Sequence, residues 1–269
     1  MKRFTAMILA AVLVLASAGV SVSAADVKAY VTIADENGKL AVARQEVTAS
    51  DIDGDGIISI NDVLYAAHES FFEGGAEAGY ASATGDYGLS LTKLWGVENG
   101  GSYGYYVNDA SAWSLADPVN AGDHVYAFVY TDTVAWSDAY SWFDASAKKA
   151  EAGEEISLTL SSLGYDADWN QVVSPVEGAK ITVNGEDAGV VTDAEGKAAV
   201  KLDKAGTYVI SAKSDTMTLV PPVCVATVAT AGLPKTGTAP FAMYAALGML
   251  MIAAGCAITA NERKRSNEI

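Results

Sequence analysis

The segment VKAYVTI, residues 27–33, alternates aliphatic side chains with lysine, tyrosine and threonine. Strict alternation of this kind predicts a half-buried β-strand whose aliphatic side chains face the core. Asn37-Gly38 follows at the place of a tight turn, because this pair tolerates the positive φ angles of a type I′ turn. Residues 40–47 are then expected to return as a second strand. The folded part of the chain therefore begins with a β-hairpin.

A helix is expected next, over residues 60–72, because apolar residues recur there on one stripe and Gly74-Gly75 follows. Two strands, a helix and further strands are the element order of a β-grasp fold. Tyr106-Val107-Asn108, a later Gly-Asp turn and a last aromatic strand resemble small secreted bacterial domains related to the C-terminal domain of transcobalamin. The resemblance implies an α+β, β-grasp-like head over residues 26–144. Its further strands are expected at residues 89–95, 104–107 and 123–131.

The loop DIDGDGIISIND, residues 51–62, carries carboxylates at its first, third, fifth and twelfth positions and glycine at the sixth. This spacing resembles the calcium loop of the EF-hand in its dockerin-like form, which wraps hard oxygen ligands around one Ca²⁺ ion. The alternative is a solvated acidic turn, although four neighbouring carboxylates repel one another without a cation. A true dockerin has two such loops and this chain has one, so we do not expect a cohesin partner. The resemblance implies these ligands: Asp51, Asp53, Asp55, the carbonyl of Ile57, Ser59 and Asp62.

Trp136, Tyr140 and Trp142 lie close together in sequence after the last strand of the head. Clustered aromatic rings can form a platform that stacks on a sugar ring or a flat corrin. They can equally cover one end of the sheet or form the contact to the next domain. We favour the packing interpretation and keep the ligand platform as the alternative.

A second, β-rich domain follows a polar segment at residues 145–154, which we interpret as a linker. Short strands separated by turns such as Asn184-Gly185 predict a small β-sandwich over residues 155–229. The segments around Asp193 and Tyr208 resemble bacterial Ig-like or transthyretin-like surface modules. The chain as a whole is therefore expected to be mainly β. Strands of the sandwich are expected at residues 156–160, 179–183, 189–192, 197–202, 206–212 and 223–228.

The C-terminal region, residues 230–269, contains Leu233-Pro234-Lys235-Thr236-Gly237, an uncharged 21-residue run at 240–260 and the basic cluster Arg263-Lys264-Arg265. The run is long enough to cross a bilayer as a helix, and the basic cluster is expected to stay cytoplasmic. This order resembles the cell-wall sorting signal of Gram-positive surface proteins. The resemblance implies that a sortase cleaves after Thr236 and joins its carbonyl to peptidoglycan, so that the membrane holds only the precursor. The alternative is an ordinary single-pass anchor.

The N-terminus and the composition agree with an extracellular location. Residues 1–25 have two basic residues, an apolar stretch and a small-residue cleavage site, which together are typical of a secretory signal peptide. The formal net charge of −16 argues against nucleic acid as a partner. Cys224 would be the single cysteine of the sorted protein, so no internal disulfide is expected.

No catalytic motif is evident around the two histidines, His68 and His124, which lie in surface-type contexts and which we interpret as structural or solvated rather than catalytic. The sequence therefore predicts a non-enzymatic, wall-anchored, calcium-binding protein for display, adhesion or binding of an unidentified extracellular ligand. The alternative is the capture of a corrinoid or another small ligand for uptake.

Overall fold

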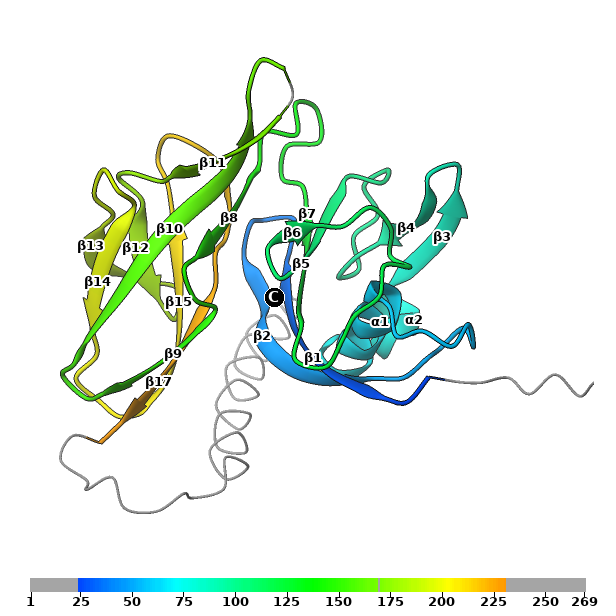
Figure 1. The fold of residues 1–269 in the computed structure, drawn as a ribbon, viewed down its shortest axis with the longest axis horizontal. Helices are drawn as coiled ribbons and strands as arrows, with labels where there is room; N and C mark the ends of the chain where they lie inside the picture. Colours follow the sequence, from blue (N-terminus) through cyan, green and yellow to red (C-terminus); the bar gives the residue numbers. More distant parts are fainter. Residues whose placement is uncertain (1–23, 169, 231–269) are drawn as a thin grey trace, which may run out of the picture.

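A computed structural model describes residues 24–168 and 170–230 of the chain (Figure 1). The expected signal peptide, apart from its last residues, the sorting pentapeptide and the span at 240–260 lie outside the described residues. Within the described part the protein is mainly β, and no helix there is long and apolar enough to cross a membrane. It consists of two packed modules, which we call the head (residues 24–138) and the sandwich (residues 139–230).

The head is built on one mixed sheet. The expected hairpin is confirmed: β1 (Val27–Ala34) pairs antiparallel with β2 (Leu40–Ala49). On its other side β1 pairs in parallel with β7 (His124–Val129), and β7 pairs antiparallel with β5 (Tyr103–Val107). The short strand β6 (Ala110–Ser111) completes the order β2-β1-β7-β5-β6.

Helix α1 (Ile60–Phe71) covers one face of this sheet and confirms the helix predicted from the apolar stripe. The shared core is aliphatic, and it includes Val63 and Leu64 of α1 together with Val31 and Ile33 of β1, all fully buried. A short helix and a hairpin follow α1, namely α2 (Gly75–Gly79), β3 (Ala81–Gly85) and β4 (Gly88–Lys93).

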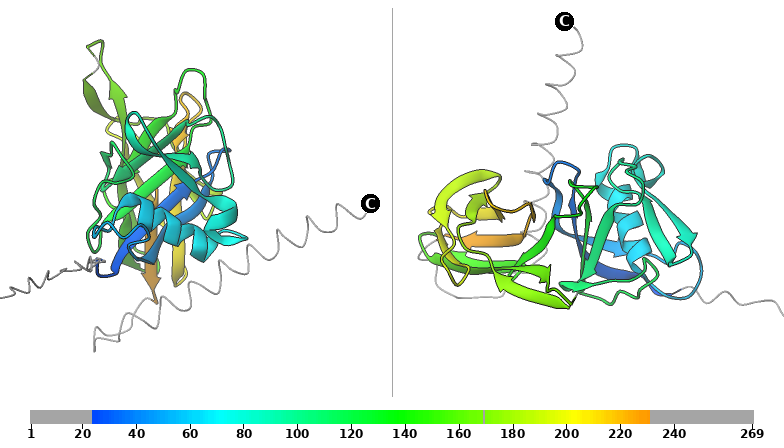
Figure 2. Two further views of the ribbon diagram at one scale, coloured as in Figure 1. Left: turned by 90° about the vertical axis from the view of Figure 1, so that its right-hand side faces the viewer. Right: turned by 90° about the horizontal axis from the view of Figure 1, so that it is seen from above.

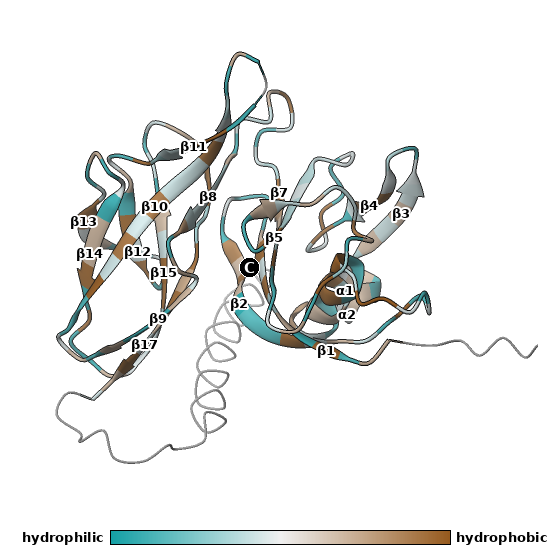
Figure 3. Cartoon of the chain, viewed as in Figure 1, coloured by the Kyte–Doolittle hydropathy of each residue, from teal (hydrophilic) through white to brown (hydrophobic). Residues whose placement is uncertain are grey.

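The sandwich has two sheets that pack face to face through an aliphatic core. Burial along its longest strand alternates, as expected for a strand with one face on the core, and Figure 3 shows the matching change of hydropathy along β10. The first sheet contains β8 (Ala139–Phe143), β10 (Glu155–Tyr165), β11 (Gln171–Pro175), β14 (Lys197–Lys201) and β16 (Leu219–Val220). The second contains β9 (Ala147–Glu151), β12 (Lys180–Val183), β13 (Glu186–Val191), β15 (Gly206–Lys213) and β17 (Cys224–Ala229).

The segment interpreted as a linker differs from that expectation. Within residues 145–154, Ala147–Glu151 forms β9, which pairs in parallel with β17 at the edge of the second sheet. The preceding strand β8, which the sequence assigned to the head, pairs with β10 and β16 of the sandwich. The partners β16 and β17 lie more than seventy residues further along the chain, and an edge strand rich in lysine has the polarity of a loop.

The two modules meet along what we call the seam, the face of the head sheet opposite α1. Tyr106, Tyr126 and Phe128 of the head pack there against Tyr140, Val220 and Val223 of the sandwich. Figure 2 shows the two modules side by side with the head sheet facing the sandwich. Strand β7 is thus covered on both faces, which explains why five of its six residues are buried.

Candidate functional site

The acidic loop between β2 and α1 brings three carboxylates together. Asp51, Asp53 and Asp55 each offer one oxygen, and these three oxygens lie within 4.8 Å of one another. Gly54 and Gly56 have φ angles of +76° and +86°, which allow the loop to turn back on itself. The loop therefore presents a cluster of oxygen ligands of the kind that Ca²⁺ binds.

The first carboxylate of the loop is held by backbone donors. The Asp51 carboxylate accepts N–H hydrogen bonds from Gly54 at 2.7 Å, Gly56 at 3.0 Å and Asp55 at 3.2 Å. Partial burial would raise the pKa of Asp51, but these donors and the N–H of Ala24 outweigh it and lower the pKa. The Asp51 carboxylate is thus kept ionised, and the backbone donors fix its orientation.

Asp62 and Ser59 hold the start of α1. The Asp62 carboxylate, which is 1% exposed, accepts the N–H of Ser59 at 2.7 Å, the hydroxyl of Ser59 at 2.6 Å and the N–H of Ile52 at 3.0 Å. The bond from the Ser59 N–H belongs to a capping box at the start of α1, and the bond from Ile52 fastens the beginning of the loop to the same helix. Of the six predicted ligands, the structure brings three carboxylates together and places Asp62 and Ser59 in this cap, while Ile57 lies exposed beside it.

Like charges disturb the ionisation of the loop. Burial raises the pKa of Asp53, and the neighbouring carboxylates of Asp55, Asp62 and Asp51 raise it further. A divalent cation among the three clustered oxygens would relieve this repulsion. The residues present therefore fit a Ca²⁺ ion held by Asp51, Asp53 and Asp55, with backbone carbonyls or water available to complete the shell.

The three aromatic residues of the predicted platform lie in different surroundings. Tyr140 is 3% exposed and stacks on Tyr106 in the seam, with ring centroids 3.6 Å apart and planes 4° from parallel. Trp142 is partly buried, with its ring centroid 5.7 Å from that of Tyr140. Trp136 is 62% exposed on the loop between β7 and β8, where its indole N–H donates to the Ser102 hydroxyl at 3.2 Å. Tyr140 and Trp142 therefore both belong to the packing between modules, and Trp136 does not.

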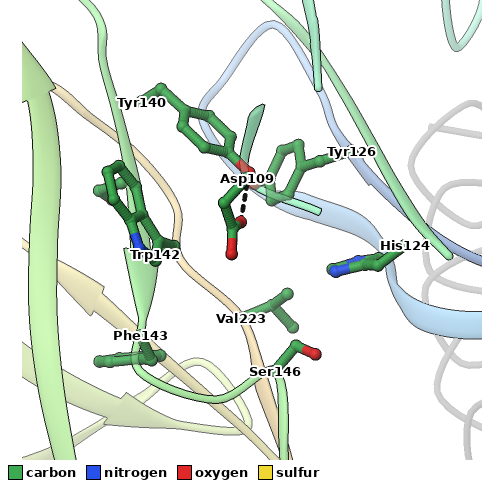
Figure 4. A pocket seen from close by; sticks show the side chains of 9 residues that line it. Asp109, His124, Tyr126, Tyr140, Trp142, Phe143, Ser146 and Val223 are labelled. Carbon is green, nitrogen blue, oxygen red and sulfur yellow. Dashed lines mark hydrogen bonds between the residues drawn. The ribbon is translucent and has the colours of Figure 1, made fainter. Parts of the chain in front are cut away.

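A small cavity lies beside Tyr140 in the seam (Figure 4). Its volume is about 10 Å³, which is room for one water molecule. The hydroxyl of Tyr140 donates to the Asp109 carboxylate at 2.8 Å across this space. Burial raises the pKa of Asp109, and the Tyr140 hydrogen bond opposes that rise. The cavity is far too small for a corrin.

Both histidines are packed into the fold rather than lying in surface contexts, which agrees with the structural alternative and not with the solvated one. His68 is completely buried, with Nδ1 2.6 Å from the Leu64 carbonyl, while Nε2 accepts the N–H of Trp95 at 3.1 Å. Burial lowers the pKa of His68 to about 4, so the ring is neutral near pH 7 with its proton on Nδ1. The sequence did carry a signal for this position, because His68 follows Leu64 by four residues and so lies on the buried stripe of α1.

His124 is half-buried at the start of β7. Its Nε2 lies 2.8 Å from the hydroxyl oxygen of Thr32, which also accepts the N–H of Arg44 at 3.0 Å. Burial, and then the positive charge of Arg44, lower the pKa of His124 to about 4. Arg44 has a φ angle of +44° in a bulge of β2, and its Nε donates to the Ser146 hydroxyl across the seam at 3.0 Å.

Comparisons with known proteins add little to this description. No protein family and no curated protein matches the chain. Among solved structures it is similar to the ectodomain of a teleost fish polymeric Ig receptor, with 13% identity, a TM-score of 0.21, and coverage of 54% of this chain and 68% of that chain. A likeness at that score supports no inference about function. The strand pairing itself defines the class: a mainly β protein of two packed modules.

Proposed function

We propose that this protein is a non-enzymatic surface protein, anchored covalently to the cell wall, that displays its two modules to bind an extracellular ligand. The order of the C-terminal segments is the observation that carries this proposal. The last strand among the described residues ends at Ala229, and Leu233-Pro234-Lys235-Thr236-Gly237 begins a few residues later. A sortase acting between Thr236 and Gly237 would therefore release the whole folded body from its membrane-held precursor.

Anchoring is tested by Thr236→Ala expressed in a Gram-positive host that has a sortase. Wild-type protein is expected in wall material released by muramidase, and the Thr236→Ala protein in the membrane fraction or the medium. Thr238→Ala is the matched control, because it makes the same change two residues further on and keeps the pentapeptide. Normal wall yield of Thr236→Ala would refute covalent sorting.

The head is proposed to be a β-grasp domain with the calcium loop inserted between its second strand and its helix. The strand order β2-β1-β7-β5, the parallel pairing of β1 with β7 and the placement of α1 on one face support this assignment. The sandwich is proposed to be an Ig-like spacer that holds the head away from the wall. Its two sheets and aliphatic core support this role.

Calcium is proposed to stabilise the head rather than to take part in a reaction. The three clustered carboxylates support binding, and the capping box of Asp62 links the loop to the start of α1. An ion that binds only the folded loop raises the free energy of unfolding by mass action.

Capture of a corrinoid is less well supported than display. Tyr140 is packed in the seam, and the cavity beside it takes one water molecule. Addition of cobalamin to the protein separates the two functions: a shifted cobalamin absorbance spectrum would favour capture, and an unchanged spectrum favours display.

A further inference from the structure

The hairpin of β10 and β11 extends beyond the body of the sandwich (Figure 1 and Figure 2). Strand β11 pairs along its whole length with residues 161–165 of β10 without any shift of register. It is the last strand of its sheet, whose order is β11-β10-β8-β16. One edge of β11 therefore faces solvent.

Strand β11 has a proline at its last position but lacks the lysines, bulges and register shifts of other long edge strands among the described residues. All five of its residues are exposed, including Val172 at 40% and Val173 at 58%. By contrast, edge strand β9 carries two lysines, β2 is bulged, and the pairing of β13 is shifted in register. Lysines and bulges keep sheet edges from pairing with other chains, so a flat, lysine-free edge is open to an added strand.

The open edge has defined hydrogen-bonding groups. The ladder between β10 and β11 is bracketed by Asp166 N–H to Asn170 carbonyl at 3.0 Å and Val176 N–H to Leu160 carbonyl at 3.1 Å. Bonded pairs alternate along an antiparallel ladder, so Val172 and Ser174 bond to β10. The N–H and carbonyl groups of Gln171 and Val173 consequently point outward. Pro175 adds a carbonyl without an N–H.

The charge around this edge selects the kind of partner. Residues 150–179 contain no lysine, arginine or histidine. Asp166 and Asp168 are exposed beyond one end of β11, and Glu177 is exposed beyond the other. A second copy of this chain would bring like charges together at both ends, whereas a basic chain would find opposite charges there.

We propose that β11 binds an extended, basic segment of a partner protein, which adds to the sheet as a strand. The backbone groups of Gln171 and Val173 would supply the main-chain bonds, and the flanking carboxylates would select lysine or arginine at the ends of the segment. This goes beyond the proposed function, because it holds whether or not the protein is sorted to the wall.

The probe is the labelled peptide acetyl-Lys-Thr-Val-Thr-Val-Lys-amide, added to the full chain in neutral detergent micelles and followed by fluorescence anisotropy. We expect saturable binding that weakens with added salt. A peptide with glutamate in place of both lysines, and one with N-methylated valines, should each bind at least about tenfold more weakly, because a tenfold change needs only 1.4 kcal/mol. Equal binding of the glutamate or N-methyl peptide would overturn the proposal.

Val173→Lys places a charge on the open edge without touching the bonds to β10, and it should weaken binding at least about tenfold. Val191→Lys is the matched control, because Val191 is 55% exposed on edge strand β13, and this variant should bind like wild type. Val173→Pro removes the outward N–H and fixes φ without removing a group that bonds to β10, and it should also lose binding. Wild-type affinity in both Val173 variants, or a wild-type dimer that Val173→Lys dissociates in sedimentation equilibrium, would overturn the proposal.

Discussion

The two faces of the head sheet are closed in different ways. On one face the aliphatic side chains of α1, β1 and β7 form a core made from the head alone. On the other face Tyr106, Tyr126 and Phe128 require Tyr140 and Val220 from the sandwich. The first face can form within the head, whereas the second exists only when both modules are folded and in contact.

The two faces of the head sheet also differ in their hydrogen bonds, because the seam contains buried tyrosine hydroxyls. In the seam, the Tyr126 hydroxyl donates to the Pro221 carbonyl at 2.5 Å and the Tyr140 hydroxyl donates to Asp109 at 2.8 Å. Burial raises the pKa values of Tyr126 and Tyr140 well above their usual range, so both stay protonated as donors. Hydrogen bonds of this kind require a particular orientation of donor and acceptor, whereas aliphatic contacts do not. The seam thereby fixes how the modules are oriented, and the α1 face mainly supplies apolar burial.

The largest effect is expected for Tyr140→Ala, which breaks the seam. Truncating a buried aromatic side chain usually costs about 3–5 kcal/mol. Tyr140→Phe keeps the ring and loses the hydroxyl bond, which should cost about 0.5–1.5 kcal/mol. Urea unfolding followed by tryptophan fluorescence measures both values. If Tyr140→Ala and Tyr140→Phe unfold at the same urea concentration as wild type, the seam contributes little to stability.

The next effect is on the pH dependence of stability, because one buried or half-buried histidine lies on each face of the head sheet. His68 and His124 have pKa values of about 4 in the folded chain, and an unfolded histidine titrates near 6.5. The unfolded state therefore binds more protons between these values. Stability is full above pH 6.5 and falls as the pH drops toward 4, by about 1.4 kcal/mol per pH unit for each histidine.

The measurement is the difference in urea unfolding free energy between pH 6.5 and pH 4.5 for wild type, His68→Gln and His124→Asn. Carboxylates contribute equally to all three proteins, so the difference between them reports the histidines. Each variant should lose part of the pH dependence. Identical pH dependence in all three proteins would show that the histidines are not held neutral.

What could be predicted from the sequence follows the same division between local and distant contacts. The first hairpin and α1 were predicted because alternation, an Asn-Gly turn and an apolar stripe are signals within a few residues. Strand β9 was missed because its Ala-Lys-Lys-Ala-Glu pattern is polar and its partner β17 lies more than seventy residues further on. The exposed strand β11 has no apolar alternation at all, and only its pairing with β10 defines it.

The candidate sites divide in the same way. The clustering of Asp51, Asp53 and Asp55 agrees with their spacing, because a single short loop places them. The spacing could not show that the Asp62 carboxylate caps α1, because this role depends on the hydrogen bonds that it accepts from Ser59 and Ile52. Nor could closeness in sequence separate Tyr140 from Trp136, because the burial of Tyr140 depends on rings contributed by the head sheet.

A smaller effect is expected from calcium on the α1 face. At about 10 mM calcium and a dissociation constant of about 10⁻³–10⁻⁴ M, mass action adds about 1.4–2.7 kcal/mol to the free energy of unfolding. Asp53→Asn should lose this gain. Asp86→Asn, the same change in the exposed turn between β3 and β4, should keep it.

Hydrogen exchange locates the calcium effect as well as detecting it. Because the loop is fastened to the start of α1 by Asp62, added calcium should slow exchange in α1 more than in β8. Thermal melts with and without calcium give the size of the effect. If wild type and Asp53→Asn melt at the same temperature with and without calcium, the loop is an acidic turn that does not bind the ion.

The smallest effect is expected for Trp136, the exposed counterpart of Tyr140. Substitutions at exposed positions usually change stability by less than about 0.5 kcal/mol, so Trp136→Ala should melt close to wild type. The φ angle of Trp136 is +49°, a conformation that glycine adopts without strain. Trp136→Gly should therefore be at least as stable as Trp136→Ala, although glycine is usually the less stable of the two by about 0.5–1 kcal/mol in regular structure. A loss of more than about 2 kcal/mol in Trp136→Ala would mean that this ring is packed, and the contrast with Tyr140 would fail.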